Sequence, residues 1–115
     1  MPPDAAHYPP VRVNERHFVK YTFVKVEPAW RRLDADERLV HKQEFLAACE
    51  DFGADHLLQS FSLVGTRGDT DLMLVAEAEN LDRIHELHVV LGQSGLMKWA
   101  TQPYSLLGIR KGSEY

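Results

Sequence analysis

The middle of the chain, residues 56–76, reads HLLQSFSLVGTRGDTDLMLVA. Its first part, residues 56–64, alternates along the chain in the way typical of a half-buried β-strand. Residues 65–70, GTRGDT, predict a turn, because glycine, threonine and aspartate suit the special backbone angles of a loop. Residues 71–76, DLMLVA, predict a second strand, so the whole stretch predicts a β-hairpin.

A helix is predicted before this hairpin, over about residues 35–52. Asp34 stands at the N-cap position, and Glu37, three residues later, completes a variant of the capping box. Gly53 is the expected stop of the helix. The apolar stripe that should face the core comprises His41, Phe45, Ala48, Cys49 and Phe52, with Leu46 at its border.

A second helix is predicted after the hairpin, over about residues 81–91. Asn80 is its expected N-cap, and Gly92 is expected to end it. Residues 95–99 predict one further helical turn. The core-facing stripe of the second helix comprises Leu81, Ile84, Leu87, His88 and Leu91, with His85 at its edge.

Strands are predicted at both ends of this arrangement. Residues 17–26, HFVKYTFVKV, and residues 103–110, PYSLLGIR, are rich in β-branched, aromatic and other apolar side chains. The resulting order is strand, helix, strand, strand, helix, strand, which is the ferredoxin-like βαββαβ order. We therefore predict an α+β fold with a four-stranded antiparallel sheet and both helices on one face.

The uncovered face of this sheet is predicted to be apolar. Its expected members are Tyr21, Phe23, Gln59, Phe61 and Tyr104. Because large exposed apolar patches usually mark an interface, we expect the chain to dimerise through the sheet face into an α+β barrel, or to pair with another domain of similar shape. These side chains would then either line a ligand cavity inside the barrel or form the core of the dimer.

Composition limits the class of protein. The 115 residues suit a Pro-rich arm, residues 1–15, followed by a single domain, residues 16–115. The net charge of −4 argues against a nucleic-acid binder, and the single cysteine, Cys49, excludes a disulfide framework within the chain. No apolar run approaches the roughly 20 residues of a membrane span. The first residues carry no apolar segment of a secretory signal, so we expect a cytoplasmic protein without membrane contact.

Three histidines are candidate metal ligands. His41 lies on the first helical stripe, where its imidazole either ligates a metal or hydrogen-bonds Glu37, one turn earlier. His85 and His88 are three residues apart and project from neighbouring points of the second helix. They would need a third ligand from His41, Glu86 or another chain, and the alternative is that they edge the core or an interface.

Two arginines are candidate ligands for carboxylates, because a guanidinium can form paired hydrogen bonds to both oxygens. Arg67 lies in the hairpin turn, where the alternative is an ion pair with Asp69 or Asp71. Arg110 lies at the end of the last strand, where the alternative is a solvated side chain.

Three segments together resemble the chlorite dismutase superfamily, a branch of the dimeric α+β barrel proteins. They are residues 23–38, FVKVEPAWRRLDADER; residues 65–74, GTRGDTDLML; and residues 103–110, PYSLLGIR. The resemblance extends over about residues 18–110. Members of the family usually have two ferredoxin-like halves in one chain, and these motifs resemble those of the N-terminal half.

The resemblance implies haem as the cofactor. In the family the C-terminal half holds the iron, through a histidine late in its first helix. When residues 33–38 are placed on that half, Glu44 and Phe45 fall near the ligand position, and His41 lies one turn earlier. His41 is therefore the expected substitute ligand, unless another subunit supplies the site. Gln59 falls near the position where the family keeps a distal arginine or glutamine.

The implied function is redox chemistry on peroxide or an oxo-anion, or the handling of a porphyrin. In that setting Arg67 and Arg110 would hold the porphyrin propionates, and Gln59 and Tyr104 are the candidate catalytic residues.

Two other functions stay open. The chain could be a non-catalytic oligomerisation module that partners a separate enzyme subunit, because no complete catalytic constellation is visible in the sequence. It could also be a cofactor-free dimeric α+β barrel monooxygenase, with Gln59 and Tyr104 as the polar groups of the cavity.

Overall fold

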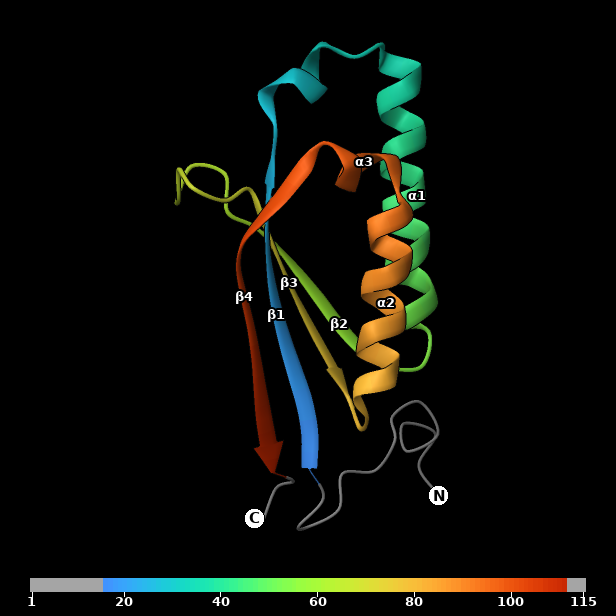
Figure 1. The fold of residues 1–115 in the computed structure, drawn as a ribbon, viewed down its shortest axis with the longest axis vertical. Coiled ribbons are helices and arrows are strands. Elements are labelled where there is room, and N and C mark those ends of the chain that lie inside the picture. The colour runs from blue at the N-terminus through green and yellow to red at the C-terminus, as the bar shows by residue number, and fades with distance from the viewer. Residues whose placement is uncertain (1–15, 112–115) are drawn as a thin grey trace, which may run out of the picture.

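The computed structural model describes residues 16–111, so the predicted arm of residues 1–15 lies outside the described residues. Four strands form one sheet, and the helices lie along one of its faces (Figure 1). The elements, in chain order, are β1 (Arg16–Val26), the short 3-10 helix η2 (Pro28–Arg32), α1 (Ala35–Gly53), β2 (Leu57–Ser62), β3 (Leu72–Ala78), α2 (Leu81–Gln93), α3 (Gly95–Lys98) and β4 (Ala100–Lys111).

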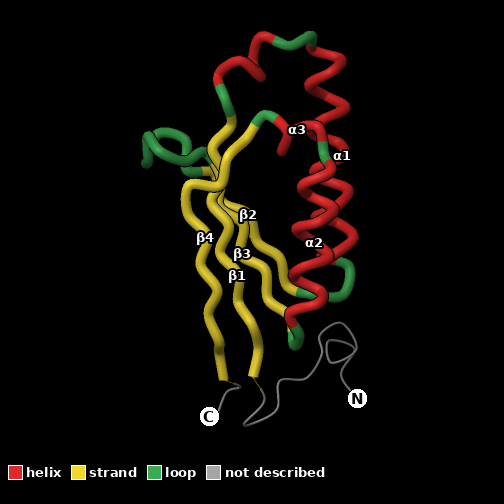
Figure 2. The backbone as a smooth tube through the Cα atoms, viewed as in Figure 1, coloured by secondary structure: helices red, strands yellow, loops and turns green. Residues whose placement is uncertain are grey.

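The strand order across the sheet is β2-β3-β1-β4, and every neighbouring pair is antiparallel. This order confirms the predicted ferredoxin-like α+β fold. Figure 2 shows the two layers, with the strands on one side and the helices on the other. No helix within residues 16–111 is long and apolar enough to cross a membrane.

The core lies between the helices and the inner face of the sheet. Val24 of β1 and Phe52 of α1 are among the most completely buried side chains, at 0% and 1% exposure. The rest of this core is contributed mainly by Trp30, Phe45, Ala48, Leu74, Ala76, Ala78, Ile84, Leu87, Leu91 and Leu96. Most of the predicted helical stripes face this core, but Leu46 and Leu81 are exposed.

Two predicted helix ends need correction. Asp34 stands at the N-cap of α1, but its carboxylate makes no capping hydrogen bond, so the predicted capping box does not form. Gly92 does not end α2, which continues to Gln93. Ser94 separates α2 from α3 instead, because its hydroxyl donates to the carbonyl of Leu91 and accepts from the amide of Met97.

The last strand begins earlier than predicted, at Ala100 rather than at Pro103. Pro103 lies inside β4, and a proline is tolerated there because β4 is an edge strand whose outer amides need no partner. Thus the predicted strand was right in kind but short at its start.

The uncovered face of the sheet has the predicted members. The register pairs Tyr21 with Val75, and Val75 with Gln59, along one row across the sheet. The next row pairs Tyr104 with Phe23, and Met73 with both Phe23 and Phe61. Because strand neighbours in register share a face, all the predicted residues lie on the side away from the helices.

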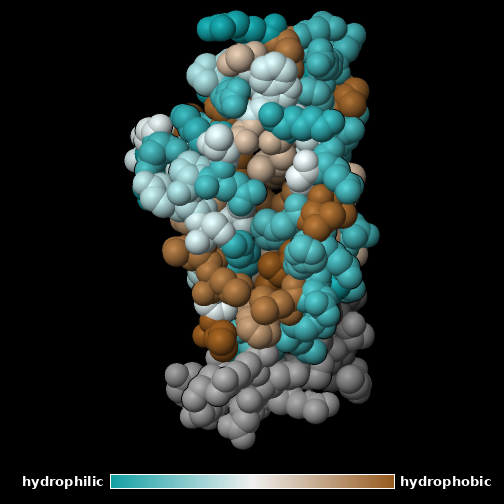
Figure 3. All heavy atoms as spheres, in the orientation of Figure 1, coloured by the Kyte–Doolittle hydropathy of each residue, from teal (hydrophilic) through white to brown (hydrophobic). Residues whose placement is uncertain are grey.

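The edge strand β4 adds further exposed apolar side chains. Leu106 and Ile109 are each 60% exposed, and Leu107 between them is 52% exposed. Figure 3 shows apolar side chains gathered along this strand. Leu106 belongs to the uncovered face, because its register partner is Tyr21.

Candidate functional site

The hairpin between β2 and β3 is anchored to β1 by Asp71. Its carboxylate accepts a hydrogen bond from the amide of Val26 (2.8 Å), and its own amide donates to the carbonyl of Val24 (2.8 Å). The ammonium of Lys25 lies 3.5 Å from the same carboxylate. These contacts fall at the point of β1 where its pairing with β4 shifts register. Asp71 therefore holds β1 from the hairpin side at this point.

Arg67 extends from this hairpin and forms a bidentate pair with Asp69. Arg67 Nε and Nη2 donate to the two carboxylate oxygens at 2.8 and 2.7 Å. The hydroxyl of Tyr104 also donates to Asp69, at 3.0 Å. The ion-pair alternative for Arg67 is therefore present, and the structure brings Arg67 and Tyr104 together.

The guanidinium of Arg67 lies against an aromatic corner. Its Cζ atom is 5.3 Å from the ring centroid of Tyr104 and 6.0 Å from that of Phe23. The two rings meet edge-to-face, with centroids 5.9 Å apart. The corner thus combines a cation, a carboxylate and two aromatic faces at one end of the uncovered sheet face.

The charges at this corner support each other. The hydrogen bond from Arg67 holds the pKa of the Asp69 carboxyl well below its usual range, and the Tyr104 hydroxyl adds to the effect. Asp69 in turn raises the pKa of Arg67. Both groups therefore stay ionised at neutral pH.

Gln59 is not part of this corner. It lies on β2, whereas Tyr104 lies on β4, at the opposite edge of the sheet. At about 5 Å per strand, the two are separated by roughly 15 Å across the face. The two candidate catalytic residues therefore share a face but do not contact each other within this chain.

Arg110 lies at the other end of the same face. Its Nη1 atom is 3.2 Å from Glu77 Oε1, and His17 approaches the same carboxylate oxygen at 4.0 Å. At about 3.3 Å per residue, Arg110 lies roughly 20 Å along β4 from Tyr104. Arg67 and Arg110 thus mark opposite ends of the face and do not converge on one small ligand.

His41 lies in the helical layer, at a corner made by η2, α1 and α3. Its Nδ1 accepts a hydrogen bond from the indole nitrogen of Trp30 at 3.0 Å. The proton of a neutral ring is then on Nε2, which lies 3.9 Å from Glu37. The ring packs on Gly95, where an added Cβ would lie only 2.1 Å from it. Neither nitrogen of the neutral ring presents a free lone pair.

His88 lies between α2 and β1. Its Nδ1 is 2.8 Å from the carbonyl of Ile84, which can only accept, so the proton of the neutral ring is on Nδ1. Nε2 then accepts from the hydroxyl of Thr22, at 2.7 Å. Burial lowers the pKa of His88, and the nearby charges of Lys20 and His85 act in the same direction. Both ring nitrogens are engaged in packing α2 on the sheet.

His85 diverges from His88. It is exposed and lines a groove of about 390 Å³ between α1 and α2, together with side chains such as Leu87 and Val90. Within residues 16–111, no three His, Cys, Asp or Glu side chains lie close enough to hold a metal ion. The structure therefore does not assemble His41, His85 and His88 into one metal site.

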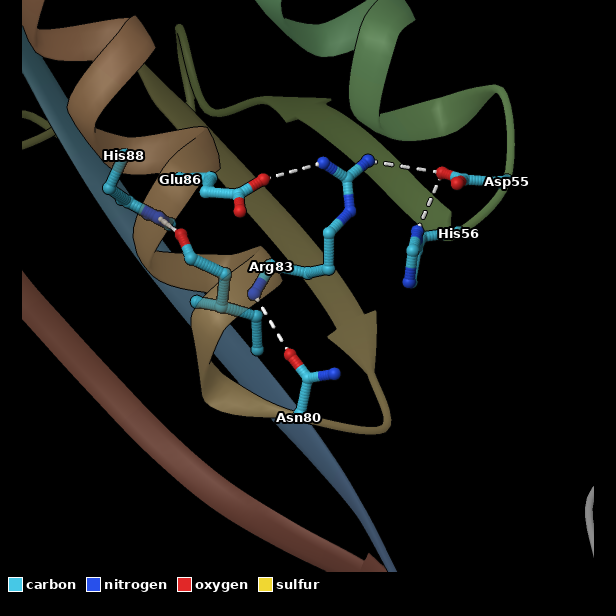
Figure 4. A network of polar contacts seen from close by, with 7 residues as sticks. Asp55, His56, Asn80, Arg83, Glu86 and His88 are labelled. Carbon is cyan, nitrogen blue, oxygen red and sulfur yellow. Dashed lines mark hydrogen bonds and ion pairs between the residues drawn. The ribbon is translucent and has the colours of Figure 1, made fainter.

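A polar network centres on Arg83, which lines this groove together with Glu86 (Figure 4). Arg83 reaches from α2 to Glu86 at 2.9 Å and to Asp55 at 3.1 Å. His56 contacts the same oxygen of Asp55 at 2.7 Å and stacks on Phe52. His56, and then Arg83, lower the pKa of Asp55. The network ties the segment between α1 and β2 to α2, although the buried Nε of Arg83 has no hydrogen-bond partner within the described residues.

Sequence reasoning missed two partners. Glu77 faces both His17 and Arg110, and Thr22 faces His88. Both are positions where a polar side chain interrupts an apolar strand face, which is a visible signal. Their partners, however, depend on strand register and on the packing of α2, which the sequence does not reveal.

Comparison with known proteins gives this fold a family. The family model described as chlorite dismutase matches residues 38–115, which is most of the chain. This chain belongs to the chlorite dismutase family. No curated protein sequence matches it significantly.

Solved chlorite dismutase structures share the fold. A mutant chlorite dismutase from Candidatus Nitrospira defluvii superposes with a TM-score of 0.79 at 19% sequence identity, over 88% of this chain and 42% of that one. A heme-binding protein from Thermus thermophilus superposes with a TM-score of 0.73 at 18% identity, over 87% of this chain and 42% of that one. The chain thus spans less than half the length of these two solved structures.

The family match includes two of the three segments on which the resemblance was based. Residues 65–74 and 103–110 lie inside the matched region, whereas residues 23–38 lie almost entirely before it. The hairpin that carries Arg67 and Asp69, and the strand that carries Tyr104, therefore belong to the part of the chain that the chlorite dismutase family model describes.

Proposed function

We propose that this member of the chlorite dismutase family associates with haem or a related porphyrin and forms one wall of an α+β barrel. The other wall is a second copy of the chain or another ferredoxin-like domain. The family membership supports the porphyrin, and so does the structural likeness to a protein described as heme-binding. The half-length match supports the need for a second wall.

The observation that carries the proposal is the apolar sheet face left uncovered by the helices. Tyr21, Phe61 and Tyr104 are exposed on it, and Leu106 is 60% exposed beside them. Contiguous apolar surface of this kind usually marks an interface or a ligand site. A porphyrin held between two such faces, or the second face itself, would remove this surface from water.

The residues of this face fit the ring and the carboxylates of a porphyrin. Tyr21, Phe23, Phe61 and Tyr104 offer aromatic and apolar contact, and Arg67 offers a guanidinium at the rim. Arg110 lies at the far end of the face and pairs with Glu77, so it does not hold a carboxylate of a ligand bound beside Arg67. Gln59 remains a candidate polar contact at the β2 edge, and Tyr104 a candidate at the β4 edge.

The iron fits less well. His17 is the histidine of this face within the described residues, and it faces Glu77. His41 lies in the other layer, where its Nδ1 accepts a hydrogen bond from Trp30 and its Nε2 lies 3.9 Å from Glu37. For His41 to ligate iron, its contact with Trp30 must first open. We therefore propose that this chain contacts the ring and its carboxylates, and that an iron ligand comes only from a facing domain other than a second copy of this chain.

Haem, when bound, would supply the redox chemistry toward peroxide or an oxo-anion. The part played by this chain is to bind and orient. Aromatic side chains exclude water from one side of the ring, and Arg67 holds a negative charge at the rim. The hydroxyl of Tyr104 donates a hydrogen bond to Asp69. Its part is therefore to orient that carboxylate rather than to move a proton.

The test is a titration with haemin and with iron-free protoporphyrin, followed by absorbance, with the mass measured by light scattering in the same samples. We expect both compounds to bind with affinities within a few-fold of each other, because the ring and carboxylates supply the contacts. Failure of both to bind would contradict porphyrin association.

A different result would contradict only the assignment of the iron. If haemin binds with a sharp Soret band while iron-free protoporphyrin does not bind, the chain itself supplies an iron ligand. Loss of that band in His41→Ala, with the exposed His85→Ala as the matched control, would then identify His41 as that ligand.

A non-catalytic interaction module is the second candidate function. The hydrogen bond that occupies His41 Nδ1, and the separation of Gln59 from Tyr104 across the sheet, favour it. In this case the uncovered face is filled entirely by a partner subunit, so neither porphyrin binds and the isolated chain forms a stable dimer or larger assembly.

A further inference from the structure

The guanidinium of Arg67 has one edge committed and one edge open. Nε and Nη2 form the committed edge, which faces the two oxygens of Asp69. No hydrogen bond runs from Nη1 to any residue between 16 and 111, and the further polar group that acts on the guanidinium is the Tyr104 hydroxyl, which helps to raise the pKa of Arg67. The open edge, made by Nη1 and the second hydrogen of Nη2, has the spacing that binds a carboxylate bidentately.

Asp69 fixes the direction of this open edge. A bidentate pair restrains a guanidinium in its plane, which a single hydrogen bond does not. The carboxylate is itself held by the hydroxyl of Tyr104 at 3.0 Å. Arg67 is therefore restrained on one edge by Asp69 and on its face by the ring of Tyr104, 5.3 Å from Cζ.

We infer that Arg67 is the residue that selects ligands with a carboxylate, and that Asp69 is the positioning residue that directs its open edge over the uncovered sheet face. The ligand class is a flat apolar ring that bears a carboxylate, since Phe23 and Tyr104 provide aromatic surface beside the guanidinium. This inference rests on the proposed function and adds to it the basis of ligand selection.

Arg110 provides the contrast. It is also an exposed arginine of the same face, but its contact is a single Nη1 that approaches Glu77 at 3.2–3.3 Å. No aromatic ring stacks on it within the described residues. Without a bidentate partner or a ring, its guanidinium is not directed, and we expect it to add little to carboxylate selection.

The experiment compares haemin with haemin dimethyl ester, in which both carboxylates are masked. Dissociation constants are measured for the full-length chain and for Asp69→Asn, Asp69→Glu, Arg67→Gln and the matched control Arg110→Gln. We expect the unaltered chain to prefer the free acid about tenfold or more, as a charge-assisted bidentate contact implies. Arg67→Gln should abolish this preference, and Asp69→Asn should reduce it several-fold.

The ratio of the two dissociation constants separates positioning from folding. A variant that merely loosens the sheet weakens both ligands alike and leaves the ratio unchanged, which would overturn the role of Asp69. Asp69→Glu should restore much of the preference, because it keeps the carboxylate, and Arg110→Gln should leave the ratio within about twofold.

Two further outcomes distinguish this inference from the proposed function. If the unaltered chain binds haemin and its ester equally well, carboxylate selection by Arg67 is wrong while porphyrin association stands. If it binds neither haemin nor its ester, the inference and the proposed function both fail.

Discussion

His88 shows how a polar side chain can belong to the core of this protein. Its ring bridges the carbonyl of Ile84 and the hydroxyl of Thr22, which is only 2% exposed. The neutral ring satisfies both contacts, whereas a protonated ring would lose its acceptor and would lie near Lys20 and His85. The position therefore favours the neutral imidazole.

Stability should consequently fall in mild acid. Burial lowers the pKa of folded His88 below its ordinary value of 6.5, so the unfolded chain takes up the proton first as the pH falls. The contribution of His88 to the free energy of unfolding is full above about pH 6.5. It is lost as the pH drops through the pKa of His88 in the folded chain. Urea unfolding at about pH 7.5 and about pH 5 measures this loss.

The control uses the same helix. We expect His88→Gln to lose less stability than the unaltered chain between the two pH values, while His85→Gln, at an exposed position, keeps most of the loss because burial is the main cause of the lowered pKa of His88. Equal losses in the unaltered chain and in His88→Gln would show that His88 is not the titrating group.

At the scale of elements, the corner between α1 and α3 depends on a glycine. A Cβ on Gly95 would lie 2.1 Å from the ring of His41, and the Gly95 amide donates to Glu44 at 2.8 Å. His41 cannot easily move, because the indole of Trp30 holds its Nδ1. Gly95 thus permits the close approach of α3 to α1.

Gly95→Ala should therefore destabilise the protein by about 1–3 kcal/mol through overpacking. In a His41→Ala background the same change should cost far less, because the obstructing ring is gone. Gly92→Ala is the matched control in α2: nothing lies within 4 Å of its added Cβ, so it should be neutral or stabilising by up to about 1 kcal/mol. Urea unfolding gives the free energy of unfolding of the unaltered chain, of the three single variants and of the double variant. Additive losses for Gly95→Ala and His41→Ala would contradict the argument.

The hairpin depends on Asp71 in a similar way. Asp71→Ala leaves the partly buried amide of Val26 without its acceptor, which should cost about 1–3 kcal/mol. Asp71→Asn keeps an acceptor oxygen and should cost less. Thermal or urea unfolding compares the two, and equal losses would show that the hydrogen bond to Val26 is not what matters.

Elements were more predictable than their ends. The period-2 and period-3.6 patterns predicted the four strands and the two long helices in the right order, because they depend on which side chains face the core, but they missed the short 3-10 helix η2. The end of α2 was misplaced because it is set by local hydrogen bonds of Ser94 to Leu91 and Met97, and the start of β4 was misplaced because pairing with β1 extends this strand back to Ala100.

The candidate site was less predictable than the fold. The shared face of Gln59 and Tyr104 follows from strand alternation, but their separation depends on the strand order. The choice of Asp69 over Asp71 as the partner of Arg67 depends on the shape of the loop, in which Gly65 adopts a φ of 86°. The hydrogen bond from the indole of Trp30 to His41 joins η2 to α1, and no local sequence pattern predicts how these two elements approach each other.

At the scale of the whole molecule, the two faces of the sheet differ in kind. The inner face is sealed by α1 and α2, whereas the outer face presents Tyr21, Phe61 and Leu106 to solvent. This chain spans 42% of a chlorite dismutase structure that shares its fold, and we propose that its open face is one wall of a larger assembly. Pairing through this face is the central claim.

Sedimentation equilibrium of the unaltered chain and of Leu106→Lys tests this claim most directly. We expect a dimer or larger assembly for the unaltered chain and a folded monomer for Leu106→Lys, because a lysine would have to be desolvated in the paired face. Leu39→Lys, at a similarly exposed position on α1, is the control and should leave the mass unchanged. A monomeric unaltered chain, or an assembly that survives Leu106→Lys, would contradict pairing through the uncovered sheet face.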